Sequence, residues 1–121
     1  MPTSDDRTTR DAVRSRLRDL ATVELPERCR ILAAQTGLHP SRVAVRDQRS
    51  RWGSCSARGA IMLNWRLLQM PPSVADYVIL HELVHLDHPN HSRRFWTGVE
   101  RVCAEWRASE RWLRRHGREL L

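Results

Sequence analysis

The chain has 121 residues, of which 40% are hydrophobic and 29% charged, enough for one globular domain and too few for two. No apolar run approaches the ~20 residues of a membrane span, and the polar N-terminus lacks the apolar stretch of a signal peptide. We therefore expect a single soluble cytoplasmic domain, monomeric and without a membrane partner.

The net charge is +7, and all 21 basic residues are Arg. Arginine binds phosphate through its planar fork, so nucleic acid is one candidate partner. The arginines are nevertheless spread over both halves of the chain, which favours a compositional origin over a binding stripe. Cys29, Cys55 and Cys103 are far apart and form no Cys-x-x-Cys pair, so we expect reduced thiols.

The first third of the chain predicts two helices. Apolar residues at helical spacing indicate an amphipathic helix from Thr8 or Thr9 to Thr22. Pro26 and the residue after it are typical of a first helical turn, and Gly37 would close this second helix. Short strands are then expected where apolar and polar residues alternate, around residues 43–45, 51–56 and 61–64, with a turn over 56–59.

The remainder predicts three more helices. One starts at residues 71–73 and runs to about Asp87, because Pro89 restricts the residue before it. Ser92 can cap the next, and a last short helix spans roughly Ser109–His116 and ends at Gly117. Helices flanking one small sheet make an α+β domain.

The sequence from His81 to His85 is His-Glu-x-x-His. On a helix, both imidazoles project from one face with their Cα atoms ~6 Å apart along the axis, which lets two nitrogens meet one zinc ion at about 2.0–2.1 Å. Glu82 lies about 100° round the helix and can reach a metal-bound water, whose pKa the metal lowers to about 7. Its carboxylate is therefore the candidate general base.

The surroundings of this motif favour a metal site over a fortuitous histidine pair. The predicted helix is apolar on almost every side, which indicates burial against two neighbours. Burying one glutamate and two histidines there without a task would be costly. For the third ligand, His91 is preferred to His88, because His88 leaves the cluster along the helix axis and the chain can fold back after Pro89.

At this point the chain resembles a known family, the YgjP-like metallopeptidase domain, a zincin related to SprT-like and WLM-type metallopeptidases. The segments that carry the resemblance lie within residues 25–117: Arg46–Ser56, Leu63–Leu67, Asp76–His85 and Asn90–Trp96. The resemblance implies a zincin-like minidomain with a small three-stranded sheet and a buried active-site helix. It also implies one Zn²⁺ per chain on His81, His85 and His91. Residues 1–24 are a helical extension here, where family members often carry a longer strand-rich region.

Three further residues are candidates for substrate contacts. Asn64 ends the strand before the active helix and could contact a peptide added to the sheet as an extra strand. Arg51 could orient substrate, although tethering its turn is the stronger interpretation. Tyr77 lies one helical turn before His81 and could donate to an oxyanion, although an aromatic at that spacing more often packs. Trp96 is expected to wall the metal pocket.

Basic and aromatic residues also gather near the C-terminus. They are Trp106, Arg107, Arg111, Trp112, Arg114, Arg115 and Arg118. Such a cluster resembles a nucleic-acid surface. Glu110, four residues before Arg114, instead favours an ordinary solvated helix face with a charge pair.

Three functions compete. The first is a zinc-dependent peptidase acting on a peptide or protein. The second is a metal-dependent hydrolase of a nucleotide phosphoanhydride, which would need arginines as a phosphate clamp. The candidates for that clamp are Arg51, Arg66, Arg93 and Arg94. The third is a nucleic-acid-binding module with a structural metal, which is disfavoured because a structural site should have four protein ligands.

Overall fold

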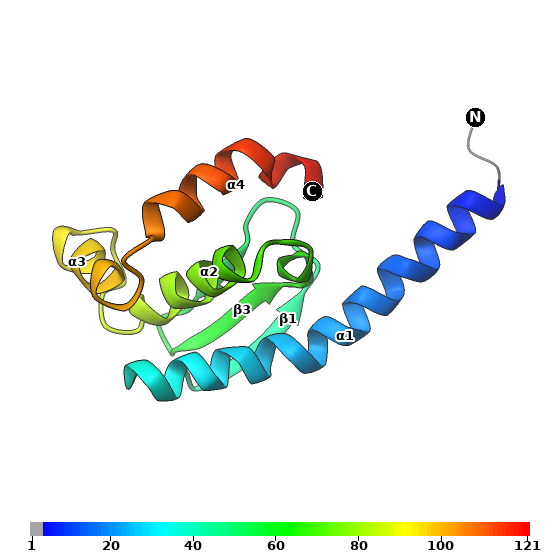
Figure 1. The fold of residues 1–121 in the computed structure, drawn as a ribbon. Coiled ribbons are helices and arrows are strands. Elements are labelled where there is room, and N and C mark those ends of the chain that lie inside the picture. Colours follow the sequence, from blue (N-terminus) through cyan, green and yellow to red (C-terminus); the bar gives the residue numbers. More distant parts are fainter. Residues whose placement is uncertain (1–3) are drawn as a thin grey trace.

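The computed structural model describes residues 4–121, with side chains from residue 7 onward. Its elements in chain order are α1 (Ser4–Thr36), β1 (Arg42–Arg46), β2 (Gly53–Cys55), β3 (Ala60–Asn64), the 3₁₀ helix η1 (Trp65–Gln69), α2 (Pro72–Val84), α3 (Arg93–Val102) and α4 (Trp106–Leu120) (Figure 1). The predicted α+β architecture is confirmed.

The three strands form one mixed sheet in the order β1-β3-β2. The central strand β3 runs parallel to β1 and antiparallel to β2. The predicted turn between β2 and β3 is present: the Gly59 amide donates to the Ser56 carbonyl at 3.0 Å, and the Ser56 amide donates to the Ala60 carbonyl at 2.9 Å. Since β3 is paired on both sides, β1 and β2 are the edge strands of the sheet within residues 4–121.

Helix α2 lies at the centre of the domain. It packs against β2 and β3 of the sheet and against α1, while α3 and α4 cover it from the other side (Figure 1). Val78 and Ile79, adjacent residues that point in different directions, are both buried. This confirms the prediction of a helix buried between two neighbours.

The first helix is one element where the sequence indicates two. Helix α1 continues through Pro26, although a proline inside a helix costs about 3 kcal/mol by removing a hydrogen bond and crowding the preceding turn. The predicted second start at Pro26 is therefore wrong. The same side of α1 is buried before and after Pro26, so packing along the continuous helix outweighs the local cost. The residues of this buried side are Ala21, Leu25, Cys29, Leu32 and Ala33.

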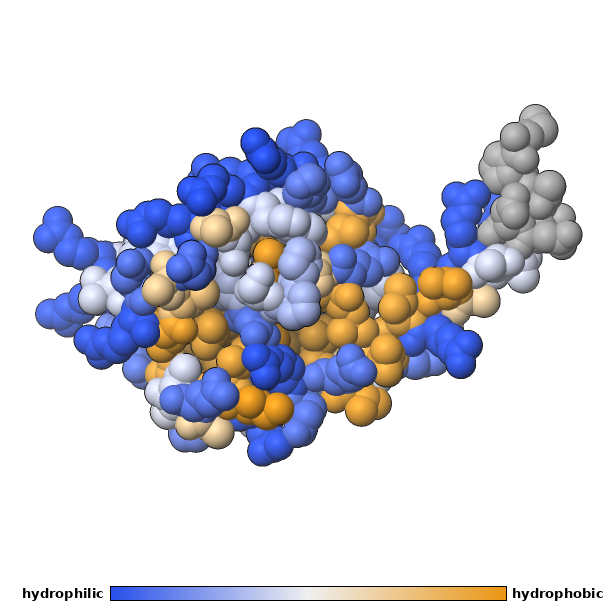
Figure 2. Space-filling view, in the orientation of Figure 1, coloured by the Kyte–Doolittle hydropathy of each residue, from blue (hydrophilic) through white to orange (hydrophobic). Residues whose placement is uncertain are grey.

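The N-terminal half of α1 projects beyond the rest of the domain (Figure 1). Val13 is 52% and Leu20 47% exposed there, and Figure 2 shows apolar side chains gathered over this helix. The predicted amphipathic pattern thus forms a helix, but much of its apolar side in this segment faces solvent.

Two of the three later helices end at other residues than the sequence predicts. Helix α2 stops at Val84, short of Asp87, because the chain tightens into a turn in which the Asp87 amide donates to the Val84 carbonyl at 3.1 Å. Helix α4 is longer than predicted and continues past Gly117. A Cβ on Gly117 would lie 3.1 Å from Cζ2 of Trp52, so this glycine lets α4 approach the β2 region instead of ending the helix.

The structure bears on two further predictions, which concern membrane-spanning helices and the cysteines. Within residues 4–121, no helix combines the length and the apolar character needed to cross a bilayer. The three cysteines are free thiols, as the spacing predicts.

Candidate metal centre

Three histidine side chains converge at the C-terminal end of α2. His81 and His85 lie one turn apart, with ring centroids separated by 5.0 Å. His91 comes from the loop between α2 and α3. Its position is set by Ser92, whose side chain caps α3 by accepting from the Phe95 amide at 3.3 Å, as the sequence predicts. One helix and one capped loop thus bring the three rings together.

The three ring nitrogens have the spacing of zinc ligands. His91 Nε2 lies 3.1 Å from His85 Nε2 and 3.4 Å from His81 Nε2. Tetrahedral Zn–N bonds of about 2.1 Å separate two ligand nitrogens by about 3.4 Å. Among the described residues, a group of possible metal ligands is formed by His81, His85 and His91, whose ligand atoms all lie within 4.8 Å of one another. The donor set fits zinc and leaves one coordination position open.

Aromatic side chains of α3 hold the histidine rings. Phe95 is fully buried and stacks on His85 with a centroid distance of 4.3 Å. Trp96 stacks on His91 at 6.0 Å, in agreement with its predicted place beside the metal pocket. These contacts restrict the rings before any ion binds, which lowers the ordering cost of binding.

His88 lies near the centre but does not offer its ring to it. Its backbone carbonyl is 3.0 Å from His85 Nδ1 and accepts the proton of that nitrogen when Nε2 serves as ligand. The His88 ring points toward Gly98 of α3, where an added Cβ would meet its Cδ2 at 3.8 Å. The early end of α2 therefore brings the backbone carbonyl of His88, and not its ring, to the histidine cluster.

Burial favours the neutral form of the two histidines on α2. Burial, followed by the proximity of His85 and His91, lowers the pKa of His81 to about 4. Burial also lowers the pKa of His85. A neutral imidazole has a free lone pair, so the lowered pKa values of His81 and His85 favour the form of these two rings that can bind a cation.

Glu82 lies beside the histidines and is only 7% exposed. Burial raises the pKa of its carboxyl to about 7, against the opposing attraction of Arg51. Gly53 of β2 leaves room for the Glu82 side chain, because a Cβ on Gly53 would lie 3.0 Å from Glu82 Cγ and 3.3 Å from Glu82 Oε2. A carboxyl with a pKa near neutrality is suited to take and return a proton. The sequence contains this glycine, but nothing in its pattern indicates that it faces Glu82.

A cleft of about 300 Å³ opens in front of these groups. It is lined by Arg51, residues 53–55 of β2, His81, Glu82, His85, Pro89 and His91. The structure thus brings together Arg51 and the four residues predicted for metal binding and catalysis. The free edge strand β2 forms one wall of this cleft.

Asn64 does not face the cleft, contrary to the suggestion that it contacts a peptide. Its side chain is fully buried and donates to the carbonyls of Gln48 at 2.7 Å and Arg51 at 3.1 Å. Its Oδ1 accepts from the Arg66 amide at 3.0 Å. Because β3 is also the central strand, its backbone is already paired. Asn64 instead holds the loop that presents Arg51.

Tyr77 is placed beside His81 but away from the cleft. Its hydroxyl lies 3.2 Å from His81 Nδ1 and donates to Glu110 Oε1 at 2.5 Å. Burial, followed by the contact with Glu110, raises the pKa of the phenol well above its usual range. Its single proton is thus committed to Glu110 and is not free for an oxyanion. The predicted charge pair between Glu110 and Arg114 is absent from the ion pairs of residues 7–121, because Glu110 points inward.

The fold is that of a metallopeptidase, as comparison with solved structures shows. The crystal structure of the metallopeptidase zymogen abylysin of Pyrococcus abyssi is similar to the chain, with a TM-score of 0.63 and 26% sequence identity. The similarity covers 76% of this chain and 91% of abylysin. A comparison with curated proteins gives no match.

The chain belongs to the YgjP-like metallopeptidase domain family, whose family model matches residues 1–116. The resemblance seen in the sequence motifs is thereby confirmed. The match also extends to the N-terminal side of residue 25, so it includes the helical segment that the motifs left outside.

Proposed function

We propose that the protein is a zinc-dependent peptidase in which Glu82 is the general base. The observation that carries the proposal is the convergence of three histidine Nε2 atoms beside a buried carboxyl whose pKa is raised to about 7. Membership of a metallopeptidase family supports it. When bound by His81, His85 and His91, a zinc ion would supply Lewis-acid polarisation of the scissile carbonyl and acidify water.

The residues of the chain then have separate tasks. Glu82 accepts a proton from the attacking water and returns it to the leaving amine, which a carboxyl with a pKa near 7 can do in both directions. Aromatic packing by Phe95 and Trp96 keeps the ligand histidines oriented. The low exposure of Glu82 limits its hydration and strengthens its interactions with the reacting groups.

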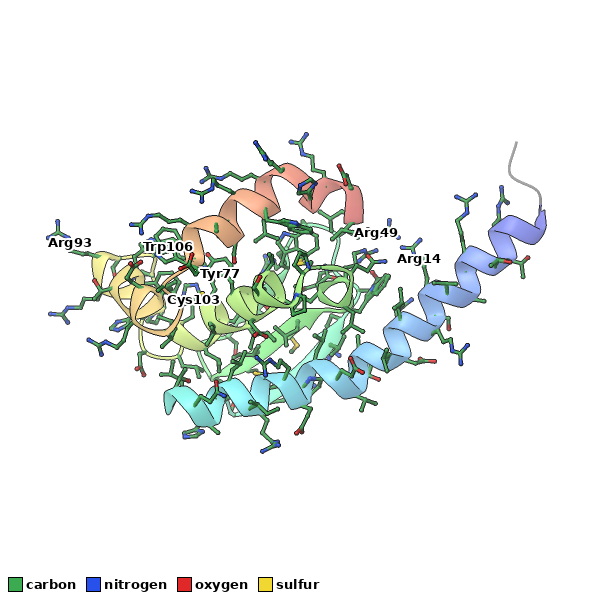
Figure 3. The ribbon with its side chains drawn as sticks, in the orientation of Figure 1. Arg14, Arg49, Tyr77, Arg93, Cys103 and Trp106 are labelled. Carbon is green, nitrogen blue, oxygen red and sulfur yellow. The ribbon has the colours of Figure 1, made fainter. Side chains whose placement is uncertain are left out.

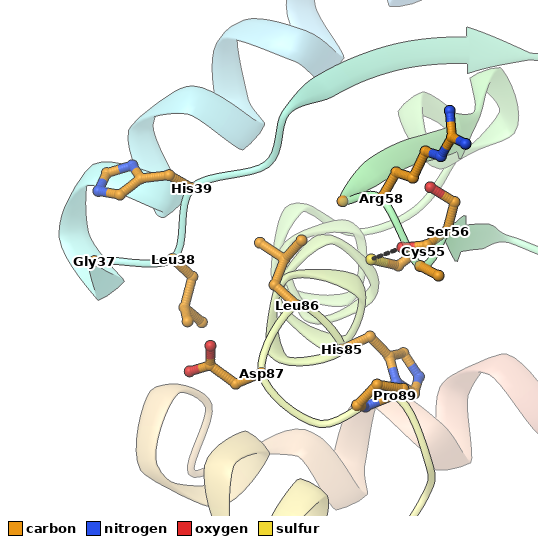
Figure 4. A pocket seen from close by; sticks show the side chains of 12 residues that line it. Gly37, Leu38, His39, Cys55, Ser56, Arg58, His85, Leu86, Asp87 and Pro89 are labelled. Atoms are coloured by element: carbon orange, nitrogen blue, oxygen red, sulfur yellow. Dashed lines mark hydrogen bonds between the residues drawn. The ribbon is translucent and has the colours of Figure 1, made fainter.

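The free edge of β2 supports a peptide as substrate. An extended peptide can add to an exposed strand through main-chain hydrogen bonds, and β2 lines the metal cleft. A second cavity of about 470 Å³ adjoins the cleft and shares Cys55, His85 and Pro89 with it (Figure 4). We assign this cavity as a pocket for a substrate side chain near the scissile bond.

Hydrolysis of a nucleotide phosphoanhydride is the alternative, and the arginines argue against it. Of the four candidates for a phosphate clamp, Arg51 lines the cleft. Arg66 is only 1% exposed and donates to Asp47 Oδ1 at 2.7 Å, so its guanidinium is buried and does not face the cleft. Arg93 lines a different hollow, beside Trp106 on α3 and α4, and Arg94 is not among the residues that line the cleft. A single arginine provides little to bind a triphosphate.

One experiment tests both functions. The zinc-loaded protein is incubated in parallel with a peptide library and a panel of nucleoside triphosphates, and Glu82→Gln, which keeps all three ligands, serves as the control. We expect peptide cleavage that falls by about 10²–10⁴-fold in the variant, while zinc binding is unchanged. Triphosphate hydrolysis without peptide cleavage, or the lack of any tightly bound transition metal after mild purification, would overturn the proposal.

A further inference from the structure

A buried chain of hydrogen bonds joins helix α4 to the metal centre. Tyr77 Oη lies 3.2 Å from His81 Nδ1 and 2.5 Å from Glu110 Oε1. Tyr77 is one turn before His81 on α2, whereas Glu110 comes 33 residues after Tyr77 and belongs to α4. Figure 3 shows Tyr77 between the two helices, close to Cys103. The side chain of Tyr77 is 1% exposed, so water does not compete for these bonds.

The number of available protons decides which group donates and which accepts in the two hydrogen bonds of Tyr77. The phenol has one proton, and the carboxylate of Glu110 can only accept it. Tyr77 must therefore act as acceptor toward His81, and the His81 ring must have its proton on Nδ1. That tautomer leaves the lone pair on Nε2, the atom that faces His91 Nε2 at 3.4 Å. The chain thus prepares the nitrogen that points into the histidine cluster.

The support given to His81 differs from that given to His85. His85 Nδ1 is held by a neutral backbone carbonyl, that of His88, at 3.0 Å. The chain from His81 ends on a carboxylate. A negative charge at the far end polarises both hydrogen bonds toward it and makes the imidazole a stronger electron donor. Glu110 is therefore the anionic partner of a ligand that it does not touch.

We propose that Glu110, acting through Tyr77, is a positioning residue of the metal centre that keeps His81 in the Nδ1-protonated tautomer and strengthens its binding to zinc. The proposal rests on the proposed role of His81 as a metal ligand. It also gives α4 a function: the helix holds an inner carboxylate against α2 while its arginines face outward.

The first experiment measures the tautomer of His81 in the metal-free protein by long-range ¹H–¹⁵N NMR of the histidine rings. We expect the Nδ1–H tautomer in the unmodified protein and a shift of the population toward Nε2–H in Tyr77→Phe, which removes the acceptor. An Nε2–H tautomer in the unmodified protein overturns the proposal. This readout needs neither zinc nor activity, so it is independent of whether the protein is a peptidase.

The second experiment measures the zinc dissociation constant by competition with a chromophoric chelator. Tyr77→Phe and Glu110→Gln should each weaken zinc binding by about 10–100-fold, as is usual for loss of a partner of a ligating histidine. Glu110→Gln keeps an oxygen acceptor for Tyr77, so it isolates the effect of the negative charge. Glu105→Gln, an exposed glutamate at the start of the same helix without a side-chain capping bond, is the matched control and should change affinity less than twofold.

Combining the two variants separates a linked chain from two unrelated defects. Because Tyr77 and Glu110 act in series, the double variant should bind zinc about as weakly as Tyr77→Phe alone. Additive losses, or single variants with unmodified affinity, overturn the proposal. Failure of the unmodified protein to bind zinc tightly would instead contradict the proposed function, and the tautomer measurement would then still decide whether Tyr77 sets the tautomer of His81.

Discussion

Gly53 and Glu82 are so close that a Cβ on the glycine would lie 3.0 Å from Glu82 Cγ, within a contact that side chains rarely make. The same Cβ would lie 3.2 Å from the Met62 carbonyl oxygen of the neighbouring strand, so it could not move away from Glu82 without disturbing the sheet. The edge strand β2 and the proposed base are therefore in close contact. The Glu82 carboxyl has room beside β2 because residue 53 is a glycine and has no side chain.

We predict that Gly53→Ala impairs turnover more than it impairs folding or metal binding. The added methyl group displaces the Glu82 carboxylate, and a misplacement approaching 1 Å costs up to about 10²-fold in rate. Zinc affinity should change little, since the ligands are untouched. Steady-state kinetics and a zinc titration on the same preparation provide the measurement.

Gly117→Ala is the matched control for this substitution. An added Cβ on Gly117 would lie 3.1 Å from Trp52 Cζ2, a contact about as tight as the one at Gly53, and Gly117 lines neither the metal cleft nor the adjoining cavity. This variant should crowd Trp52 while keeping its turnover. Equal losses of turnover in both alanine variants would show that general destabilisation, and not the position of Glu82, explains the effect.

The raised pKa of Glu82 predicts a pH-dependent stability of the metal-free protein. The folded-state pKa of about 7 exceeds the ordinary value of 4.5, so between these pH values the folded state binds more protons than the unfolded state. The contribution of Glu82 to the free energy of unfolding therefore falls as pH rises from about 4.5 to about 7. Glu82→Gln removes this penalty.

The variant should consequently be more stable than the unmodified protein by up to about 3 kcal/mol at pH 8 and about equally stable at pH 4. Urea unfolding of both chelator-treated proteins at the two pH values measures this difference. Taking the difference between the two proteins cancels the titration of the histidines that they share. A difference that is the same at both pH values would contradict the raised pKa.

His91→Ala should weaken zinc binding, whereas His88→Ala should leave it unchanged. His91 contributes one of three converging nitrogens. Loss of a residue that only hydrogen-bonds to a ligand weakens metal binding by about 10–100-fold, so loss of His91 should weaken zinc binding by more than that. His88 acts through its backbone carbonyl, which alanine retains, so His88→Ala should bind zinc normally. Zinc titrations of the two variants make the comparison. Normal binding by His91→Ala together with loss in His88→Ala would mean that the third ligand is assigned to the wrong histidine.

The arginines of α4 should give weak and salt-sensitive binding to duplex DNA. Figure 2 shows hydrophilic side chains over this helix, and Arg111, Arg114 and Arg115 are exposed. If the arginine content is compositional, such contacts are nonspecific, and affinity should collapse between about 50 and 200 mM salt. Fluorescence anisotropy with a labelled random duplex measures this. Submicromolar binding that survives at the higher salt would favour a nucleic-acid function for this face.

The sequence determined the parts of the protein that depend on local spacing. Two histidines four residues apart must share one face of a helix, and Pro89 prevents that helix from continuing to His91. Ser92 then caps α3, and the turn after β2 closes at Gly59. Each of these features is decided within a few residues by backbone geometry, which is why the convergence of the histidines and the short strands could be predicted from the sequence.

Tertiary structure alone decided what distant segments do to one another. Pro26 lies inside α1 because packing on both sides of it outweighs a local penalty. Asn64 turns inward because its amide finds the carbonyl of Gln48, 16 residues away. Glu110 turns toward Tyr77, and not toward its helical neighbour Arg114, because a buried hydroxyl is a better partner than a hydrated guanidinium at the surface. Burial and long-range hydrogen bonding set these outcomes, and neither leaves a periodic signal in the sequence.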